Sequence, residues 1–104
     1  MKEIIWTAGA GRELQEVYEQ LEDARDESGA ALLEDVQRIL SLASSQPFMG
    51  TYFEKPTRKL LVARRYGIIY SPEDRGIVVL SFVDLRRDLQ PLRKRIRDWF
   101  GGRE

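Results

Sequence analysis

Arginine and lysine side chains are the residues of this sequence best suited to bind or act on a ligand, and they gather near the ends of predicted strands. Two pairs of neighbours stand out: Arg64 with Arg65, and Arg86 with Arg87. A third group precedes another predicted strand and consists of Lys55, Arg58 and Lys59. Clustered guanidinium groups bind phosphate or carboxylate through paired N–H donors. The pattern indicates a site for a nucleic acid or an acidic protein segment; the alternative is a solvated charged surface.

The sequence contains neither histidine nor cysteine. Histidine is the commonest general base near neutral pH and the commonest ligand of transition metals. Without thiolates, neither a disulfide nor a cysteine-based zinc site can form. Catalysis that depends on a histidine dyad or triad is therefore excluded, and any reaction would have to use Arg, Lys, Tyr, Asp or Glu. We predict no metal site and no cofactor.

The two halves of the chain carry opposite charge although the whole chain of 104 residues is neutral. Residues 1–46 contain ten acidic and four basic residues, a net charge of −6. Residues 47–104 contain thirteen basic and seven acidic residues, a net charge of +6. Such a dipolar surface is more informative about partners than the net charge is. We expect the basic half to meet a partner and the acidic half to be a solvated helical scaffold.

Length and composition predict one soluble domain over residues 1–104. With 42% apolar residues, the chain can bury a single core without disulfides. No apolar run approaches the about 20 residues that a membrane-spanning helix needs, and no signal-peptide pattern is found at the N-terminus. Since cysteine is absent, we expect a cytoplasmic protein with no membrane association.

Hydrophobic periodicity predicts a strand and two helices in the first half. The strand is expected over residues 2–7, with Thr7 as the N-cap of the next helix. Apolar residues at helical spacing predict helices over residues 8–26 and 30–44, joined by a short break at Ser28-Gly29 into an antiparallel hairpin. A late start of the first helix is expected because its first turn contains two glycines, Gly9 and Gly11.

The second half predicts a connector, three strands and a hairpin loop. The connector is expected over residues 48–57 and the strands over 60–63, 66–70 and 77–83. Residues 71–76 form the expected hairpin loop, because they combine Ser, Pro, Asp and Gly. The third of these strands is apolar on both faces, which places it in the interior of the sheet.

A last helix is expected over residues 89–100, with Asp88 as its cap, Pro91 in its first turn and Gly101 closing it. Its predicted buried stripe consists of Leu92, Ile96, Trp99 and Phe100. Its basic residues are expected to form a solvated face, which comprises Arg93, Lys94, Arg95 and Arg97.

The element order β-α-α-β-β-β-α predicts an α+β fold, in which the helical hairpin packs on a mainly antiparallel four-stranded sheet with a C-terminal helix. If the last three strands form a meander, the start of the middle strand lies beside the end of the last one. The two arginine pairs should therefore cluster at that edge, together with Tyr66. Arg58 should lie at the opposite edge.

Several short motifs, in the right order over nearly the whole chain, resemble the RelE/ParE toxin superfamily. The start of its members is similar to the opening Ile4-Ile5-Trp6-Thr7-Ala8 and the following Leu14-Gln15-Glu16-Val17-Tyr18. The segment with proline and glycine that follows their second helix is similar to Pro47-Phe48-Met49-Gly50. Arg58-Lys59-Leu60 and Tyr66-Gly67-Ile68-Ile69-Tyr70 match two of the family's strands. Residues 77–80 match its last strand, and residues 84–88 match the Arg-Arg-Asp motif that follows this strand. Together these motifs are fairly specific.

The resemblance implies a bacterial toxin of a type II toxin–antitoxin pair, of the kind found in plasmid stabilization, neutralised by a small cognate antitoxin. RelE-like members cut mRNA on the ribosome with a basic cluster and commonly a tyrosine in the final helix region, whereas ParE-like members poison DNA gyrase. Arg86 matches the strand-end arginine, but residues 88–92 contain no tyrosine. The departure favours a ParE-like gyrase inhibitor, and we expect its target or antitoxin to bind at Arg58, Arg64, Arg65, Tyr66, Arg86 and Arg87.

Two alternatives to a gyrase inhibitor stay open. One is an mRNA endonuclease that works through Arg58, Arg65 and Arg86, although a permanently protonated arginine is a poor base and only Tyr66, Tyr70 or a carboxylate could serve. The other is a non-toxic remnant or interaction domain with the same fold. In each case the hairpin and the sheet should leave an apolar groove, which is filled by an antitoxin segment or by self-association into a homodimer.

Overall fold

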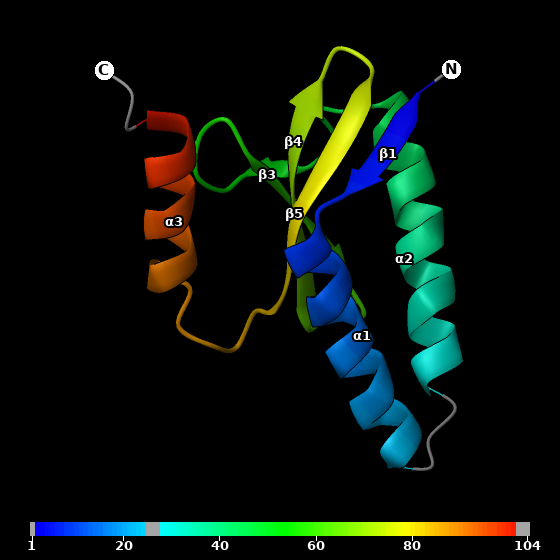
Figure 1. Cartoon of the computed structure of the whole chain (residues 1–104). Coiled ribbons are helices and arrows are strands. Elements are labelled where there is room, and N and C mark those ends of the chain that lie inside the picture. Colours follow the sequence, from blue (N-terminus) through cyan, green and yellow to red (C-terminus); the bar gives the residue numbers. More distant parts are fainter. Residues whose placement is uncertain (1, 25–27, 102–104) are drawn as a thin grey trace.

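One five-stranded sheet carries three helices in the part of the chain that the structure describes, residues 2–24 and 28–101 (Figure 1). The structure is a computed structural model. In chain order its elements are β1 (Glu3–Trp6), α1 (Ala8–Asp23), α2 (Ser28–Ser45), β2 (Thr51–Tyr52), β3 (Arg58–Val62), β4 (Tyr66–Glu73), β5 (Gly76–Asp84) and α3 (Gln90–Gly101). None of the described helices is both long and apolar enough to cross a membrane.

The strand order of the sheet is β1-β5-β4-β3-β2. The last three strands form the predicted antiparallel meander, and β1 lies parallel to β5, so the α+β class is confirmed. The prediction of four strands is wrong, because the expected connector contains a fifth strand, β2, which pairs with the start of β3. β2 has only two residues, Thr51 and Tyr52, which is too short for any periodicity to appear in the sequence.

The helices cover the two faces of the sheet unequally. Figure 1 shows α1 and α2 side by side on one face and α3 alone on the other. Ile68 and Tyr70 point into the main core beneath the hairpin, while Ile69 joins Phe53 and Ile96 in a smaller core beneath α3. This alternation is the two-residue period of a strand. The sheet therefore has two cores, and α3 packs on the smaller one.

The start of α1 and the start of α2 differ from the prediction. Thr7 is the N-cap, as predicted, since its Oγ1 accepts a hydrogen bond from the Ala10 N–H at 3.2 Å. This cap offsets the cost of the glycines in the first turn. Helix α1 therefore starts at Ala8, and the predicted late start is wrong. Ser28-Gly29 begins α2 instead of breaking the pattern. A Cβ at Gly29 would lie 3.1 Å from a Tyr18 ring carbon, so the glycine allows α1 and α2 to approach closely. The expected end of the first helix at residue 26 lies outside the described residues.

The hairpin between β4 and β5 is longer than predicted. Ser71 and Pro72, expected in a loop, continue β4 opposite Val78 and Ile77. The loop shrinks to the residues between Glu73 and Gly76, because pairing with the apolar β5 outweighs the turn propensity of Ser-Pro. The interior position of β5 is confirmed, since it has β1 on one side and β4 on the other.

The last helix is buried over less of its length than predicted. Asp88 caps the helix as predicted, because its carboxylate accepts a hydrogen bond from the Gln90 N–H at 3.0 Å, but the helix begins at Gln90, one residue later than expected. Ile96 is fully buried, but Trp99 is 52% and Phe100 42% exposed, so the predicted buried stripe is wrong at these two positions. The smaller core ends before them. Gly101 is the last helical residue and not a residue beyond the helix.

Candidate functional site

Asp84 links two of the predicted arginines at the end of β5. Its carboxylate accepts hydrogen bonds from Arg65 Nε at 3.2 Å, from Arg86 Nη2 at 3.2 Å and from the Arg86 backbone N–H at 3.0 Å. Asp84 is opposite Tyr66 in the register of β5 and β4, so the β3–β4 turn lies beside the end of β5, as the meander predicts. The structure thus brings Arg65 and Arg86 together on one carboxylate.

Hydrogen bonds from Arg86, and secondarily from Arg65, hold the pKa of Asp84 well below its usual range. The same pairing raises the pKa of Arg86. Asp84 is therefore ionised at neutral pH. A carboxylate with so low a pKa is a weak base.

Replacing Asp84 by asparagine should lower the free energy of unfolding at neutral pH. Because the pKa of Asp84 is lower in the folded than in the unfolded chain, ionised Asp84 stabilises the fold above about pH 4, and this stabilisation is lost as the pH falls further. Urea unfolding at pH 7 and pH 3 measures the difference in the free energy of unfolding between the wild type and the variant. This difference should be smaller at pH 3. A difference of equal size at both values would mean that Asp84 acts through packing and not through its charge.

The other members of the two arginine pairs have different surroundings. Within the described residues, neither Arg64 nor Arg87 forms an ion pair. Arg64 is exposed in the β3–β4 turn, where its φ of 59° and that of Ala63, 54°, lie in the left-handed region. Arg87 lines a pocket beside Asp84, whereas Arg64 does not. Three of the four predicted arginines are therefore at one site.

That pocket has a volume of about 260 Å³ and lies between α1, the end of β5 and the start of α3. We call it the arginine pocket. The charged residues that line it are Arg65, Arg87, Arg95, Glu13, Glu16, Asp84 and Asp88. Three cations against four carboxylates give no excess of positive charge. The described residues form no cluster of carboxylates that could hold a metal ion.

Among the charged residues of the arginine pocket, sequence reasoning assigned only Arg65 and Arg87 to a site; Glu13 and Arg95 are two of those that it missed. The Glu13 carboxylate accepts hydrogen bonds from Ser81 Oγ at 2.9 Å and from the Phe82 N–H at 3.0 Å, and so joins α1 to β5. Nothing in its spacing distinguishes Glu13 from the exposed acids around it. Arg95 lines the pocket from α3 and forms no ion pair within the described part of the chain. Nothing in the sequence distinguishes Arg95 from the neighbouring basic residues of the predicted solvated face.

Tyr66 is a core residue at the wall of the arginine pocket. Its ring stacks on Phe82 with the centroids 5.3 Å apart, and only 6% of it is exposed. The Arg65 guanidinium lies 5.1 Å from the centroid of the same ring. Tyr66, which we expected among the residues that bind a partner, therefore packs the core and supports Arg65.

Arg58 belongs to another part of the molecule. Its Nη1 donates to the carbonyl oxygens of Phe48 at 2.9 Å and Gly50 at 2.6 Å. Arg58 lies opposite Tyr70, four residues along β4 from Tyr66, which is a separation of about 13 Å along the strand. The three arginines of the endonuclease alternative are therefore not gathered at one site.

Tyr70 also holds the loop that contains Phe48 and Gly50. It is fully buried, its hydroxyl donates to the Pro47 carbonyl at 2.7 Å, and the hydroxyl oxygen accepts from the Gly50 N–H at 3.2 Å. Burial raises the pKa of Tyr70 above its ordinary value. The phenol thus stays protonated and keeps its donor role.

Replacing Tyr70 by phenylalanine should lower the free energy of unfolding by about 1–3 kcal/mol, because Gly50 N–H and Pro47 C=O lose their partner. Since the pKa of Tyr70 is raised in the folded state, the wild-type protein should also lose stability above about pH 10, where the unfolded phenol ionises first. Urea unfolding at pH 7 and pH 11 tests both effects. A variant as stable as the wild type at pH 7 would show that the loop does not depend on this hydroxyl.

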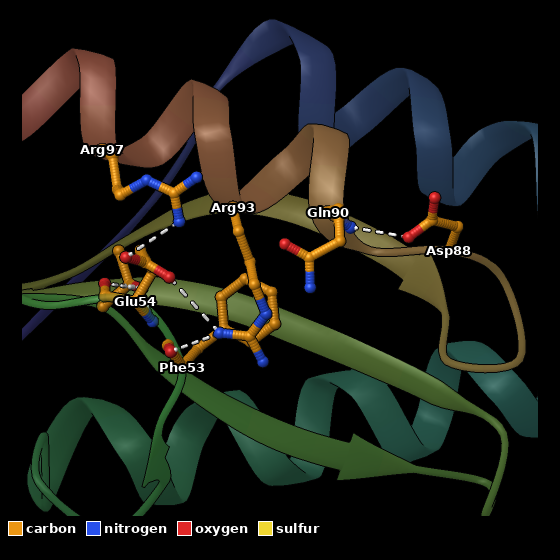
Figure 2. A network of polar contacts seen from close by, with 7 residues as sticks. Phe53, Glu54, Asp88, Gln90, Arg93 and Arg97 are labelled. Atoms are coloured by element: carbon orange, nitrogen blue, oxygen red, sulfur yellow. Dashed lines mark hydrogen bonds and ion pairs between the residues drawn. The ribbon is translucent and has the colours of Figure 1, made fainter.

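Two basic residues of α3 hold the helix on the sheet, contrary to the predicted solvated face. Arg93 Nη1 donates to the Phe53 carbonyl at 2.7 Å and to Glu54 Oε1 at 3.4 Å, and its guanidinium lies 4.0 Å from the Phe53 ring centroid. Arg97 Nη1 lies 3.3 Å from Glu54 Oε2. Figure 2 shows both arginines reaching from the helix to Glu54. Glu54 thus anchors α3 to the loop after β2.

An apolar groove is present between β1 and α2, as predicted. It has a volume of about 560 Å³ and its apolar lining comprises Ile4, Trp6, Leu14, Leu33, Val36 and Leu40. β1 is an edge strand, and Ile4 and Ile5 are 37% and 45% exposed. An edge strand presents unpaired backbone groups to a further strand. The groove therefore offers both apolar surface and backbone hydrogen bonds.

No protein-family model matches the chain, and no curated protein is similar to it in sequence. Among solved structures, a chain of the chromosomal ParDE toxin–antitoxin system from P. aeruginosa is similar with a TM-score of 0.66 and 18% sequence identity. The similarity covers 81% of this chain and 96% of that chain. At this level of identity it shows a shared fold.

Proposed function

We propose that this protein is the toxin of a type II toxin–antitoxin pair and that it acts, like a ParE toxin, by binding DNA gyrase in the bacterial cytoplasm. The fold similarity to a chain of a ParDE system over 81% of the sequence supports a toxin of this class. The sequence motifs of the RelE/ParE superfamily point in the same direction. Gyrase is the target that the ParE side of this resemblance implies.

The charge balance of the arginine pocket is the observation that favours binding over RNA cleavage. Three arginines and four carboxylates line the pocket, so it offers no net attraction to a polyanion. Cleavage by the 2′-hydroxyl also needs a group that accepts its proton. Asp84 is held ionised with a low pKa by Arg86, and Tyr66 is packed against Phe82. A mixed-charge pocket is suited to the side chains of a protein surface.

The groove between β1 and α2 supports a protein antitoxin as the partner. An extended or amphipathic segment could bury Ile4 and Trp6 and pair with the free edge of β1. A short protein encoded next to this chain is the candidate to test. If light scattering shows instead that the purified chain forms a homodimer that this neighbour does not dissociate, the groove is filled by self-association.

Expression in growing bacteria tests this function in the cell. Induction of the chain alone should stop growth and trigger the response to DNA breaks, and co-expression of the neighbouring protein should restore growth. Normal growth without the partner would instead favour a non-toxic interaction domain.

An mRNA endonuclease is the second candidate, favoured by the pairing of Arg65 and Arg86 at the end of β5. Primer extension on translated mRNA from induced cells separates the two functions. Cuts at defined codon positions would establish the endonuclease, and intact transcripts in arrested cells would remove it.

A further inference from the structure

The loop from Pro47 to Tyr52 exposes the most solvent-accessible large hydrophobic side chains of the described residues. Phe48 is 69% and Tyr52 62% exposed, and Met49 between them is 42% exposed. The loop flanks the β4–β5 hairpin end of the sheet, whereas the arginine pocket lies at the other end. Neither the pocket nor the β1–α2 groove includes these side chains. They form a separate surface, which we call the aromatic platform and define by Phe48, Tyr52 and Arg58.

The backbone beneath the aromatic platform is held in place from two strands. Tyr70 of β4 bonds to Pro47 and Gly50, and Arg58 of β3 donates to Phe48 and Gly50. Four hydrogen bonds thus fix a loop whose largest side chains bury little of themselves against the protein. A surface that is already ordered loses little conformational entropy on binding. This arrangement is typical of an interaction surface and not of a loop that merely connects two elements.

Cations adjoin the exposed rings. The Arg58 guanidinium lies 4.3 Å from the Tyr52 centroid and 5.1 Å from the Phe48 centroid. Lys55 Nζ lies 5.8 Å from the Tyr52 centroid. The aromatic platform and Lys55 line a groove of about 650 Å³, and Lys2 lines it too. Tyr and Arg are enriched among the residues that contribute most of the binding energy at protein interfaces.

Acidic residues stand only at the hairpin side of this groove. They are Glu73 and Asp74, and Glu73 already accepts a hydrogen bond from Ser71 Oγ at 2.8 Å. The groove thus contains three cations and two carboxylates, which is too little positive charge for the continuous phosphate track of a nucleic acid. It is enough to pair with a few carboxylates of a protein segment.

We propose that the aromatic platform docks a protein segment in which an aromatic anchor residue is flanked by aspartate or glutamate. The anchor packs on the free faces of Phe48 and Tyr52, and the flanking carboxylates pair with Lys55 and Lys2. This site goes beyond the proposed toxin function, because it is separate from both the arginine pocket and the β1–α2 groove.

Fluorescence anisotropy with a labelled synthetic peptide, a tryptophan flanked by aspartate and glutamate, tests the site. Replacing Phe48 and Tyr52 together by alanine should weaken binding at least about tenfold, the effect of losing hot-spot contacts. Lys55→Glu should weaken it comparably, and added salt should weaken it for the wild type. Leu42→Ala is the matched control, because Leu42 is 47% exposed on α2 and should leave binding unchanged. Circular dichroism of each variant verifies its fold.

Several outcomes would overturn the proposal. The first is that a peptide with lysine in place of aspartate and glutamate binds as tightly as the acidic peptide. The second is that oligouridylate binds more tightly than the acidic peptide through the same rings. The third is that the double alanine variant binds the acidic peptide as tightly as the wild type does. Failure of the acidic peptide to bind at millimolar concentration would do the same. So would self-association of the wild type that the double variant abolishes, since a second copy would then be the occupant. None of these results bears on gyrase, so this proposal and the toxin function fail independently.

Discussion

Replacing Gly76 by alanine is expected to detach β1 from the sheet and to lower the free energy of unfolding by about 3 kcal/mol. Gly76 has a φ of +152° and lies opposite Glu3 in the parallel pair of β1 and β5. A Cβ at this position would lie 1.9 Å from the Glu3 carbonyl oxygen and 2.5 Å from its nitrogen. These are backbone atoms of Glu3, which cannot rotate away as a side chain can, so β1 must move. Chemical denaturation measures the loss, and hydrogen exchange of residues 3–6 locates it.

Gly11→Ala is the matched control for this substitution. A Cβ at Gly11, within α1, would meet no atom within 4 Å, so the change should raise stability by about 0.5–1 kcal/mol. The Gly76 variant should also lose the β1–α2 groove, because Ile4 and Trp6 line it, and with the groove its affinity for an antitoxin. Wild-type stability in the Gly76 variant would contradict the parallel pairing of β1 and β5.

Replacing Ile96 by alanine is expected to cost about 2–4 kcal/mol and to loosen α3. Ile96 is fully buried and packs with Leu92, Phe53 and Ile69 in the smaller core. That core and the Glu54 contacts of Arg93 and Arg97 are what hold α3 to the sheet. Thermal or urea denaturation gives the loss, and hydrogen exchange in α3 should rise more than in β4.

Trp99→Ala separates this account of α3 from the sequence-based one. Trp99 is the larger residue, and helical periodicity predicts it to be buried. The structure leaves it 52% exposed, so its removal should change stability by no more than about 0.5 kcal/mol. A larger cost for Trp99→Ala than for Ile96→Ala would show that α3 is rotated so that Trp99, and not Ile96, faces the sheet.

Sequence periodicity predicted the parts of the fold that repeat over many residues. Apolar runs separated by turn residues predicted the last three strands, and arranging these strands as a meander placed Arg65 beside Arg86. Thr7 was recognisable as a cap because it precedes a long amphipathic pattern. These features depend on local chemistry, which the sequence contains in full.

The features that were missed depend on contacts between distant residues. β2 exists only because Thr51 and Tyr52 meet the start of β3. Arg58 satisfies carbonyl groups of a loop that no pattern marks as its neighbour. Trp99 has the right spacing for burial, but the smaller core ends before it. The same applies to Glu13, whose hydrogen bonds to β5 cross most of the sequence.

Supercoiling of relaxed plasmid by purified gyrase, with and without the purified chain, is the most direct test of the central claim. We expect micromolar protein to abolish supercoiling and to accumulate cleaved DNA, and we expect the protein encoded next to this chain, the proposed antitoxin, to restore activity. A variant with glutamate at both Arg87 and Arg95, which reverses the unpaired cations of the arginine pocket, should inhibit at least about tenfold less. Full supercoiling with no cleaved DNA at micromolar wild-type protein would contradict the claim.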